Sequence, residues 1–191
     1  MVGKAGILSA IQSTDQGDIV AGSPALIDLE SSIKKRTGQA EILREAFKDL
    51  KRKYDYVLID APPRGNVIID NCLTASDGVI IPMEPTYSDL RAVEQIVRNV
   101  ETVKKLSNKK LAVIGFVFNK WDGRPALCRN VLQDTKERAE ELGTVVFDTK
   151  IRKCIAIQEA QSGALGIFDY APKSNAAKDF KALAREFIER T

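Results

Sequence analysis

The sequence predicts an α/β fold, a three-layer, mostly parallel sheet with helices on both faces. Two observations predict it. Short apolar runs, rich in β-branched residues, are nearly continuous rather than alternating with polar residues, which is typical of strands buried on both faces. Amphipathic stretches separate these runs, and this alternation indicates βαβ crossovers. A length of 191 residues and the lack of an evident linker predict one domain over residues 1–191.

Each element follows from its local pattern. We expect helices over residues 39–53, 88–106, 127–142 and 173–190, because each carries one apolar stripe at helical spacing. The first 37 residues are less regular and suggest a helix over 5–13, a strand at 19–21 and a helix over 24–33. Strands are expected at Tyr56–Ile59, Val79–Ile81, Leu111–Phe118 and Val145–Phe147.

The composition excludes several function classes. A net charge of +3 is too even for a polybasic protein, and the absence of histidine excludes a Ser-His-Asp triad and any His-ligated metal site. The three cysteines are far apart in sequence, so we expect no zinc site and no disulfide framework. With no apolar run of about 20 residues and no signal-peptide pattern, we expect a cytoplasmic protein.

A carboxylate stands at the end of the first main apolar run. Asp60 follows Tyr56–Ile59, and ligands of open α/β sheets bind beyond the carboxyl ends of strands. An Asp in that position can hold Mg²⁺, directly or through a water, although it can equally be a helix cap or a loop residue. The pair Pro62-Pro63 favours the metal interpretation because it makes a rigid loop beside the carboxylate.

A second polar string follows the run that ends at Phe118. Asn119-Lys120-Trp121-Asp122 matches the NKxD pattern of GTP-binding proteins, in which the Asp reads guanine. The alternative is a polar loop in which Asp122 caps the helix that starts near Arg124-Pro125. Four residues with one free position are a weak signal by themselves.

The order of the motifs carries more information than any one of them. The string YDYVLIDAPP at residues 54–63, then NCLTASDGVIIP at 71–82, resembles the ParA/Soj/MinD family of partitioning ATPases. Similar segments continue at residues 149–151, 158–160, 167–174, 176–180 and 183–186, so the resemblance covers about residues 18–186. It implies the SIMIBI-like fold of P-loop NTPases, with ATP and Mg²⁺ as cofactors.

The resemblance also implies residue roles. Asp60 would be the Walker B carboxylate, which is both catalytic and the Mg²⁺ ligand. The nucleotide would contact Pro62 in the adjoining loop, Asn119 and Asp122 in the loop after the third run, and Ile151 and Arg152 in the loop after Thr149. Trp121-Asp122 resembles the aromatic-Asp pair of ParA proteins, which favours ATP, with GTP binding as the alternative.

One family motif is missing from the sequence. The family's Gly-rich KGGxGK[ST] phosphate loop has no counterpart among the 191 residues, and in the nearest string Lys4 is followed by Ala5. Without the strand of that loop, the run that ends at Asp60 would have an unpaired apolar edge. We therefore expect the C-terminal three-quarters of a longer ParA domain; the alternative is a shortened relative that pairs this edge with another copy or another protein.

Partners are likewise implied by the resemblance. It suggests a nucleotide-dependent homodimer that binds non-specific DNA, works in plasmid or chromosome segregation at the nucleoid, and responds to a ParB-like partner. Candidate DNA contacts are Arg124, Arg129, Lys150 and Lys153, each of which can equally be a solvated surface charge. The last helix resembles the packed final helix of ParA, so we expect no membrane binding. The alternative function is a non-hydrolysing module that binds DNA or a partner.

Overall fold

The computed structural model describes residues 6–23, 30, 33, 37–50, 53–62 and 67–191. The chain divides into two compact units, the first formed by residues 1–78 and 98–111 and the second by residues 79–97 and 112–191. The expectation of one domain over residues 1–191 stays a prediction.

A parallel β-sheet lies at the centre of the second unit. Strands β3 (Gly78–Met83) and β4 (Ala112–Phe118) pair side by side and point the same way, and Phe116 forms a further parallel bridge to Val146. The amide of Phe116 donates to the carbonyl of Val145, and the amide of Phe147 donates to the carbonyl of Phe116, each over 2.9 Å. The runs expected at 79–81 and 111–118 are therefore strands, and the run at 145–147 extends their ladder.

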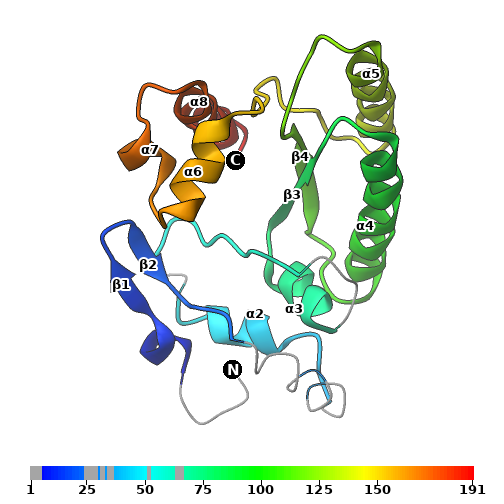
Figure 1. Cartoon of the computed structure of the whole chain (residues 1–191). Helices are drawn as coiled ribbons and strands as arrows, with labels where there is room; N and C mark the ends of the chain where they lie inside the picture. Colours follow the sequence, from blue (N-terminus) through cyan, green and yellow to red (C-terminus); the bar gives the residue numbers. More distant parts are fainter. Residues whose placement is uncertain (1–5, 24–29, 31–32, 34–36, 51–52, 63–66) are drawn as a thin grey trace. The chain divides into compact units, whose positions relative to one another are not determined.

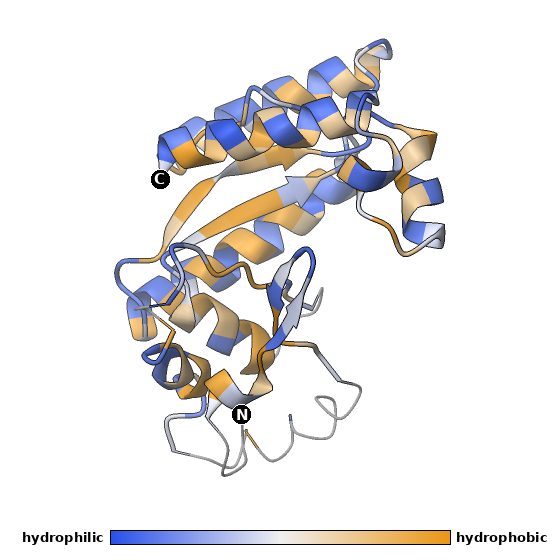
Figure 2. Cartoon of the chain, turned by 90° about the vertical axis from the view of Figure 1, so that its left-hand side faces the viewer, coloured by the Kyte–Doolittle hydropathy of each residue, from blue (hydrophilic) through white to orange (hydrophobic). Residues whose placement is uncertain are grey.

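Helices cover both faces of this sheet. Figure 1 shows α4 (Tyr87–Leu106) and α5 (Ala126–Glu141) on one side of the strands, with α6 (Ile155–Ser162) and α8 (Asn175–Arg190) on the other. A short helix, α7 (Ile167–Tyr170), joins α6 to α8. In Figure 2 the strands are largely hydrophobic while the helices carry both colours, as expected of strands buried between amphipathic helices.

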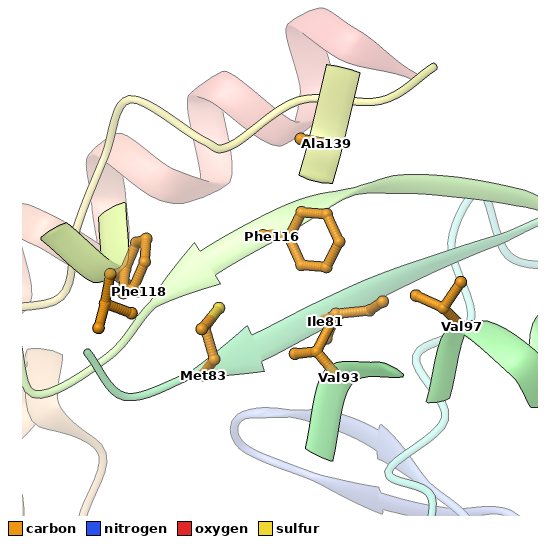
Figure 3. Close-up of a cluster of buried hydrophobic side chains, with 8 residues drawn as sticks. Ile81, Met83, Val93, Val97, Phe116, Phe118 and Ala139 are labelled. Atoms are coloured by element: carbon orange, nitrogen blue, oxygen red, sulfur yellow. The ribbon is translucent and has the colours of Figure 1, made fainter. Parts of the chain in front are cut away.

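The core of the second unit follows from these periodicities. Alternate strand residues point to one face, so Ile81 and Met83 meet Phe116 and Phe118 on the side of α4 and α5. Figure 3 shows this cluster, which is completed by four helical residues: Val93, Val97, Val131 and Ala139. Phe116, Phe118 and Val131 are fully buried, and burying a side chain of this size contributes about 1.5–3 kcal/mol.

In the first unit, a buried asparagine connects two helices. α2 (Ile42–Phe47) contacts α3 (Val67–Ala75), and the side chain of Asn71 accepts a hydrogen bond from the Leu43 amide over 3.1 Å. The same side chain donates to the carbonyls of Gln39 and Val67, over 2.6 and 2.8 Å. Its polar atoms are thus satisfied, which removes the cost of burying them.

The N-terminal elements differ from those expected. Instead of a helix over residues 5–13, a 3-10 turn, η1 (Ile7–Ala10), leads into strand β1 (Gln12–Thr14), which pairs antiparallel with β2 (Gly17–Ile19). The pairing ends at Ile19, so residues 20–21 are not strand, and most of the helix expected over 24–33 lies outside the described residues. Helices α3, α6 and α7 were not among the expected elements, because each is short and carries a weak periodic pattern.

The largest correction concerns the run at residues 56–59, which is extended but forms no strand. Its side chains are also not buried: Val57 is 44% and Leu58 is 84% exposed. A strand exists only through hydrogen bonds to a neighbour. Among the described residues, nothing pairs with the backbone of Val57–Asp60.

Of the helices that the structure describes, none combines the length and the apolar character that crossing a bilayer requires.

Candidate functional site

Two loops are joined where β4 ends. The Ile151 amide donates to the carbonyl of Phe118 over 2.8 Å, and the Trp121 amide donates to the carbonyl of Ile151 over 2.9 Å. The Lys153 amide then donates to the carbonyl of Trp121 over 3.3 Å. These bonds continue the parallel ladder beyond the sheet, so the predicted site residues of the loops at 119–122 and 150–153 lie side by side. The side chain of Ile151 is buried, so Ile151 contributes to this junction through its backbone amide and carbonyl.

An open pocket of about 550 Å³ lies at these loops, at the carboxyl end of β4. This is where open α/β sheets bind their ligands, and the volume suits a small molecule. The lining combines an aromatic ring and an aliphatic side chain with charged and amide groups: Trp121, Asp122, Gly123, Arg124, Arg152, Lys153, Ile155 and Asn175.

The indole of Trp121 is held from two sides. Its ring centroid is 5.3 Å from that of Phe118, tilted by 58°, and the Lys150 ammonium lies 5.8 Å from it. Burial lowers the pKa of Lys150. Gly123 lies so close that a Cβ there would be 2.9 Å from the indole Nε1, so a larger residue would have to displace the ring. The predicted DNA contact Lys150 is thus partly buried against the pocket aromatic.

Asp122 is engaged by Arg124. The guanidinium donates to both carboxylate oxygens, over 2.9 and 3.0 Å, and these bonds lower the pKa of Asp122. The Arg124 side chain is 91% exposed, so the pair can open at little cost. The guanidinium of Arg129 donates to the backbone carbonyl of Arg124 over 2.8 Å. The two arginines, both predicted DNA contacts, therefore lie together with Asp122 at the start of α5.

Arg152 is oriented by α8. Its Nε and Nη2 donate to the carboxylate of Asp179 over 2.9 and 2.6 Å, and its backbone amide donates to the same group over 3.1 Å. Burial raises the pKa of Asp179, but the bonds from Arg152 outweigh burial and the net shift is downward. The predicted nucleotide contact Arg152 thus lines the pocket while its charge is compensated.

Asn119 begins the first loop. The backbone amide of Asn119 donates to the carbonyl of Met83, and its side-chain oxygen accepts from the backbone amide of Lys120, both over 2.8 Å. Lys120 has φ +49°, a left-handed conformation that is uncommon outside glycine, and its ammonium lies 2.5 Å from the carboxylate of Glu84. Strained backbone of this kind is concentrated at functional sites.

Asp60 and Pro62 lie in the first unit, where both are exposed. The carboxylate of Asp60 makes no hydrogen bond or ion pair with any other described residue. An exposed carboxylate fits Mg²⁺, which is commonly bound through one or two carboxylates and the phosphates of its substrate. The described residues contain no cluster of three or more metal-ligating side chains, so Asp60 would supply a single protein ligand.

Two carboxylates that hold the second loop were missed by the sequence analysis. Besides Asp179, Glu186 of α8 accepts the amides of Asp148 and Thr149, over 2.7 and 2.8 Å. Burial raises the pKa of Glu186, but these bonds and those from Arg190 bring it down to about 2. A signal existed: Asp179 and Glu186 are two turns apart on one helical face, next to the apolar stripe.

Comparison with known proteins places this geometry in a family. A family model described as an AAA domain matches residues 1–113. The chromosome-partitioning ATPase Soj of Treponema pallidum is 30% identical over 193 residues, which cover all of this chain and 75% of Soj. The chain belongs to the ParA/Soj/MinD family of partitioning ATPases.

Other relatives of this ParA-like chain extend the comparison. An uncharacterized protein of Mycobacterium tuberculosis is 34% identical over 173 residues, or 91% of the chain, and the match spans about half, 54%, of that protein. The septum site-determining protein MinD of Pyrococcus horikoshii, complexed with Mg-ADP, is 25% identical and has a TM-score of 0.68 over 95% of this chain and 68% of MinD. The expected α/β fold of P-loop NTPases is confirmed.

Proposed function

We propose that this chain provides the base-binding part and the metal carboxylate of a ParA-like partitioning ATPase. The observation that carries the proposal is the pocket at the carboxyl end of β4, where Asp122 and Arg152, both predicted nucleotide contacts, lie beside Trp121. Asn119 starts the same loop, and Ile151 supports it through its backbone.

The pocket offers what an adenine base requires. The indole supplies an aromatic face for stacking, and Asn119 and Asp122 supply amide and carboxylate groups for the polar edge of the base. Because the ion pair between Asp122 and Arg124 is exposed to solvent, Asp122 can exchange Arg124 for a ligand group at little cost. Pro62 belongs to the loop that would approach the nucleotide beside Asp60.

The Asp60 carboxylate would hold Mg²⁺ through its oxygens or a bound water. The metal, when bound, offsets the negative charge of the phosphates and so assists phosphoryl transfer. The role of this chain's own residue is to orient the ion from the loop that follows Ile59. The MinD of Pyrococcus horikoshii is described as complexed with Mg-ADP, which supports this cofactor assignment.

DNA binding, dimerisation and partner response complete the proposal. Arg124, Arg129 and Lys153 are exposed around the pocket, and Lys150 joins them at its edge. Such a group can neutralise phosphates without reading sequence. In this function the chain forms a nucleotide-dependent homodimer on non-specific DNA in the cytoplasm, at the nucleoid, and a ParB-like partner stimulates release.

The single tryptophan makes a direct test possible, because Trp121 is the only indole in the chain. Titration with Mg-ATP should change its fluorescence saturably, and ATP should compete better than GTP. Asp122→Asn should weaken ATP binding several-fold, whereas Glu140→Gln, an exposed position on α5, should not. No saturable change, together with no heat on calorimetric titration, would exclude nucleotide binding by this polypeptide.

A second candidate is a non-hydrolysing module that binds DNA or a partner. It is supported by one observation, that Arg124, Arg129 and Lys153 are exposed and could contact DNA phosphates without any nucleotide turnover. The two candidates differ in turnover: the ATPase releases phosphate when DNA and partner are present, and the module does not. A phosphate-release assay, with DNA binding measured in parallel, distinguishes them.

A further inference from the structure

An ion pair joins the carboxyl ends of the two central strands of the second unit. Glu84 directly follows β3, Lys120 lies two residues after the end of β4, and the ammonium of Lys120 is 2.5 Å from the carboxylate of Glu84. The strand ends, Met83 and Phe118, are neighbours in Figure 3, and the amide of Asn119 donates to the carbonyl of Met83 over 2.8 Å. Neither member of the ion pair lines the pocket, yet the residue after Lys120 is the pocket indole.

The backbone of Glu84 is held from both sides by the start of α4. The carboxylate of Asp89 accepts the amide of Glu84 over 2.7 Å, and the amide of Thr86 donates to the carbonyl of Glu84 over 2.7 Å. Asp89 and Thr86 also bond each other, since the Thr86 hydroxyl donates to the carboxylate over 3.2 Å and accepts the amide of Asp89 over 3.1 Å. The ion pair therefore starts from an ordered backbone, and only side-chain freedom is lost when it forms.

Lys120 carries a turn between two directions of the loop. Its φ of +49° is left-handed, a conformation that costs energy for a residue with a β-carbon and persists only where neighbouring contacts impose it. On one side of the turn, the amide of Asn119 is bonded to β3. On the other side, the amide of Trp121 donates to the carbonyl of Ile151 over 2.9 Å. A change of conformation at Lys120 would therefore move the indole relative to the rest of the pocket.

We propose that Glu84 is a positioning residue for the pocket: by binding Lys120, it holds the left-handed turn that places Trp121 against the ligand. This role depends on the proposed function, because the ligand is the nucleotide base that stacks on the indole. Glu84 itself touches no ligand and acts only through Lys120. The contacts run in order from the first turn of α4 to the pocket, through Asp89, Glu84, Lys120 and Trp121.

The charge and the exposure of the ion pair fit this role. The hydrogen bond and the charge of Glu84 raise the pKa of Lys120, and the charge of Asp89 adds to this effect. Both side chains remain partly exposed, 41% for Glu84 and 55% for Lys120, and exposed pairs contribute little to the free energy of unfolding. Replacing either side chain should therefore change the loop and leave the fold intact. Glu84→Gln also keeps the anchor, because Asp89 binds the backbone of residue 84.

The first test uses the chain without nucleotide. Trp121 is the only tryptophan, so quenching of its fluorescence by acrylamide reports on this loop alone. Glu84→Gln should raise the quenching constant and shift the emission to longer wavelength, while the urea midpoint stays that of the wild type. The matched control is Glu141→Gln, which removes a 65% exposed carboxylate from an ion pair with Arg138 on α5 and should leave the quenching unchanged.

The second test separates backbone strain from charge. Lys120→Ala removes the ion pair and keeps the β-carbon that the left-handed turn disfavours, whereas Lys120→Gly removes the pair and relieves the turn. Titration with Mg-ATP should give a Kd about two- to fivefold higher for Lys120→Ala and for Glu84→Gln, and Lys120→Gly should recover part of the loss. A lysine that only attracted phosphates would give a different pattern, with equally weak Lys120 variants and a Glu84→Gln variant that binds ATP as tightly as the wild type.

The positioning role and the proposed function fail in different ways. A chain that binds no nucleotide contradicts the proposed function, and the quenching of Glu84→Gln then still decides whether Glu84 holds the indole. Wild-type quenching for Glu84→Gln would overturn the positioning role. So would a wild-type Kd for Glu84→Gln in a chain that binds ATP, or a Lys120→Gly variant that binds no better than Lys120→Ala.

Discussion

The carboxylate of Asp179 accepts three hydrogen bonds from Arg152, two from the guanidinium and one from the backbone amide. This pair fixes the loop at residues 150–153 to α8 and so shapes one wall of the pocket. Asp179 is 8% exposed, while the Arg152 side chain is 47% exposed. Water can therefore solvate the guanidinium without its partner, whereas the carboxylate needs the hydrogen bonds from Arg152 to offset its burial.

Replacing Asp179 should therefore loosen the pocket as well as the fold. We expect Asp179→Asn to lower the free energy of unfolding by about 1–3 kcal/mol, because the charge-assisted bidentate bond to Arg152 is lost at a buried position on α8. Urea denaturation measures the loss, and Glu189→Gln, an exposed position on the same helix, is the control. Equal stability of the two variants would contradict a positioning role for Asp179.

Glu186 should make stability depend on acid. Its pKa is about 2 in the folded chain against an ordinary 4.5, so its contribution is fully present above about pH 4.5 and is lost as the pH falls toward about 2. Glu186→Gln should remove this dependence and destabilise the chain by about 1–3 kcal/mol near neutral pH. Unfolding measured over a pH series should then give a flatter profile for the variant; an unchanged profile would refute the assignment.

Gly115 should tolerate no side chain. A Cβ there would lie 2.6 Å from the Phe147 ring and 2.9 Å from the carbonyl oxygen of Val145. Because that carbonyl belongs to the ladder beside β4, relief requires the backbone to move, and we expect Gly115→Ala to cost about 1–3 kcal/mol. Gly163→Ala is the matched control, since its nearest contacts are 3.6–3.7 Å, and thermal melting compares the two. Similar melting temperatures for Gly115→Ala and Gly163→Ala would show that the backbone beside Gly115 shifts at little cost, which would contradict this prediction.

Lys153 should contribute to DNA affinity through charge alone. If it contacts a phosphate, Lys153→Ala should weaken binding to DNA of any sequence and reduce the slope of log affinity against log salt by about 1. Fluorescence anisotropy with labelled duplexes at several salt concentrations measures this slope. Lys181→Ala, an exposed lysine of α8, should leave it unchanged. An unchanged slope for Lys153→Ala would show that Lys153 does not contact DNA and is a solvated surface charge.

At the loops around the pocket, the sequence predicts which residues are present but not which of them bind each other. Polar residues after the run that ends at Phe118 are visible in the sequence, and their neighbourhood with residues 150–153 follows from family resemblance. The sequence does not show that Arg152 is bound by Asp179, because α8 offers three carboxylates, those of Asp179, Glu186 and Glu189. Burial distinguishes Asp179 from the others, and burial depends on how α8 packs.

Local patterns were enough to predict the alternation of strand and helix, the family and the positions of the polar loops, because periodicity and short motifs are local properties of the chain. Which of the expected strands forms depends on packing between distant segments. The runs before Met83 and Phe118 find neighbours and become β3 and β4, whereas Val57–Asp60 has no partner among the described residues and stays extended. A strand requires hydrogen bonds from another segment, and no local pattern contains that information.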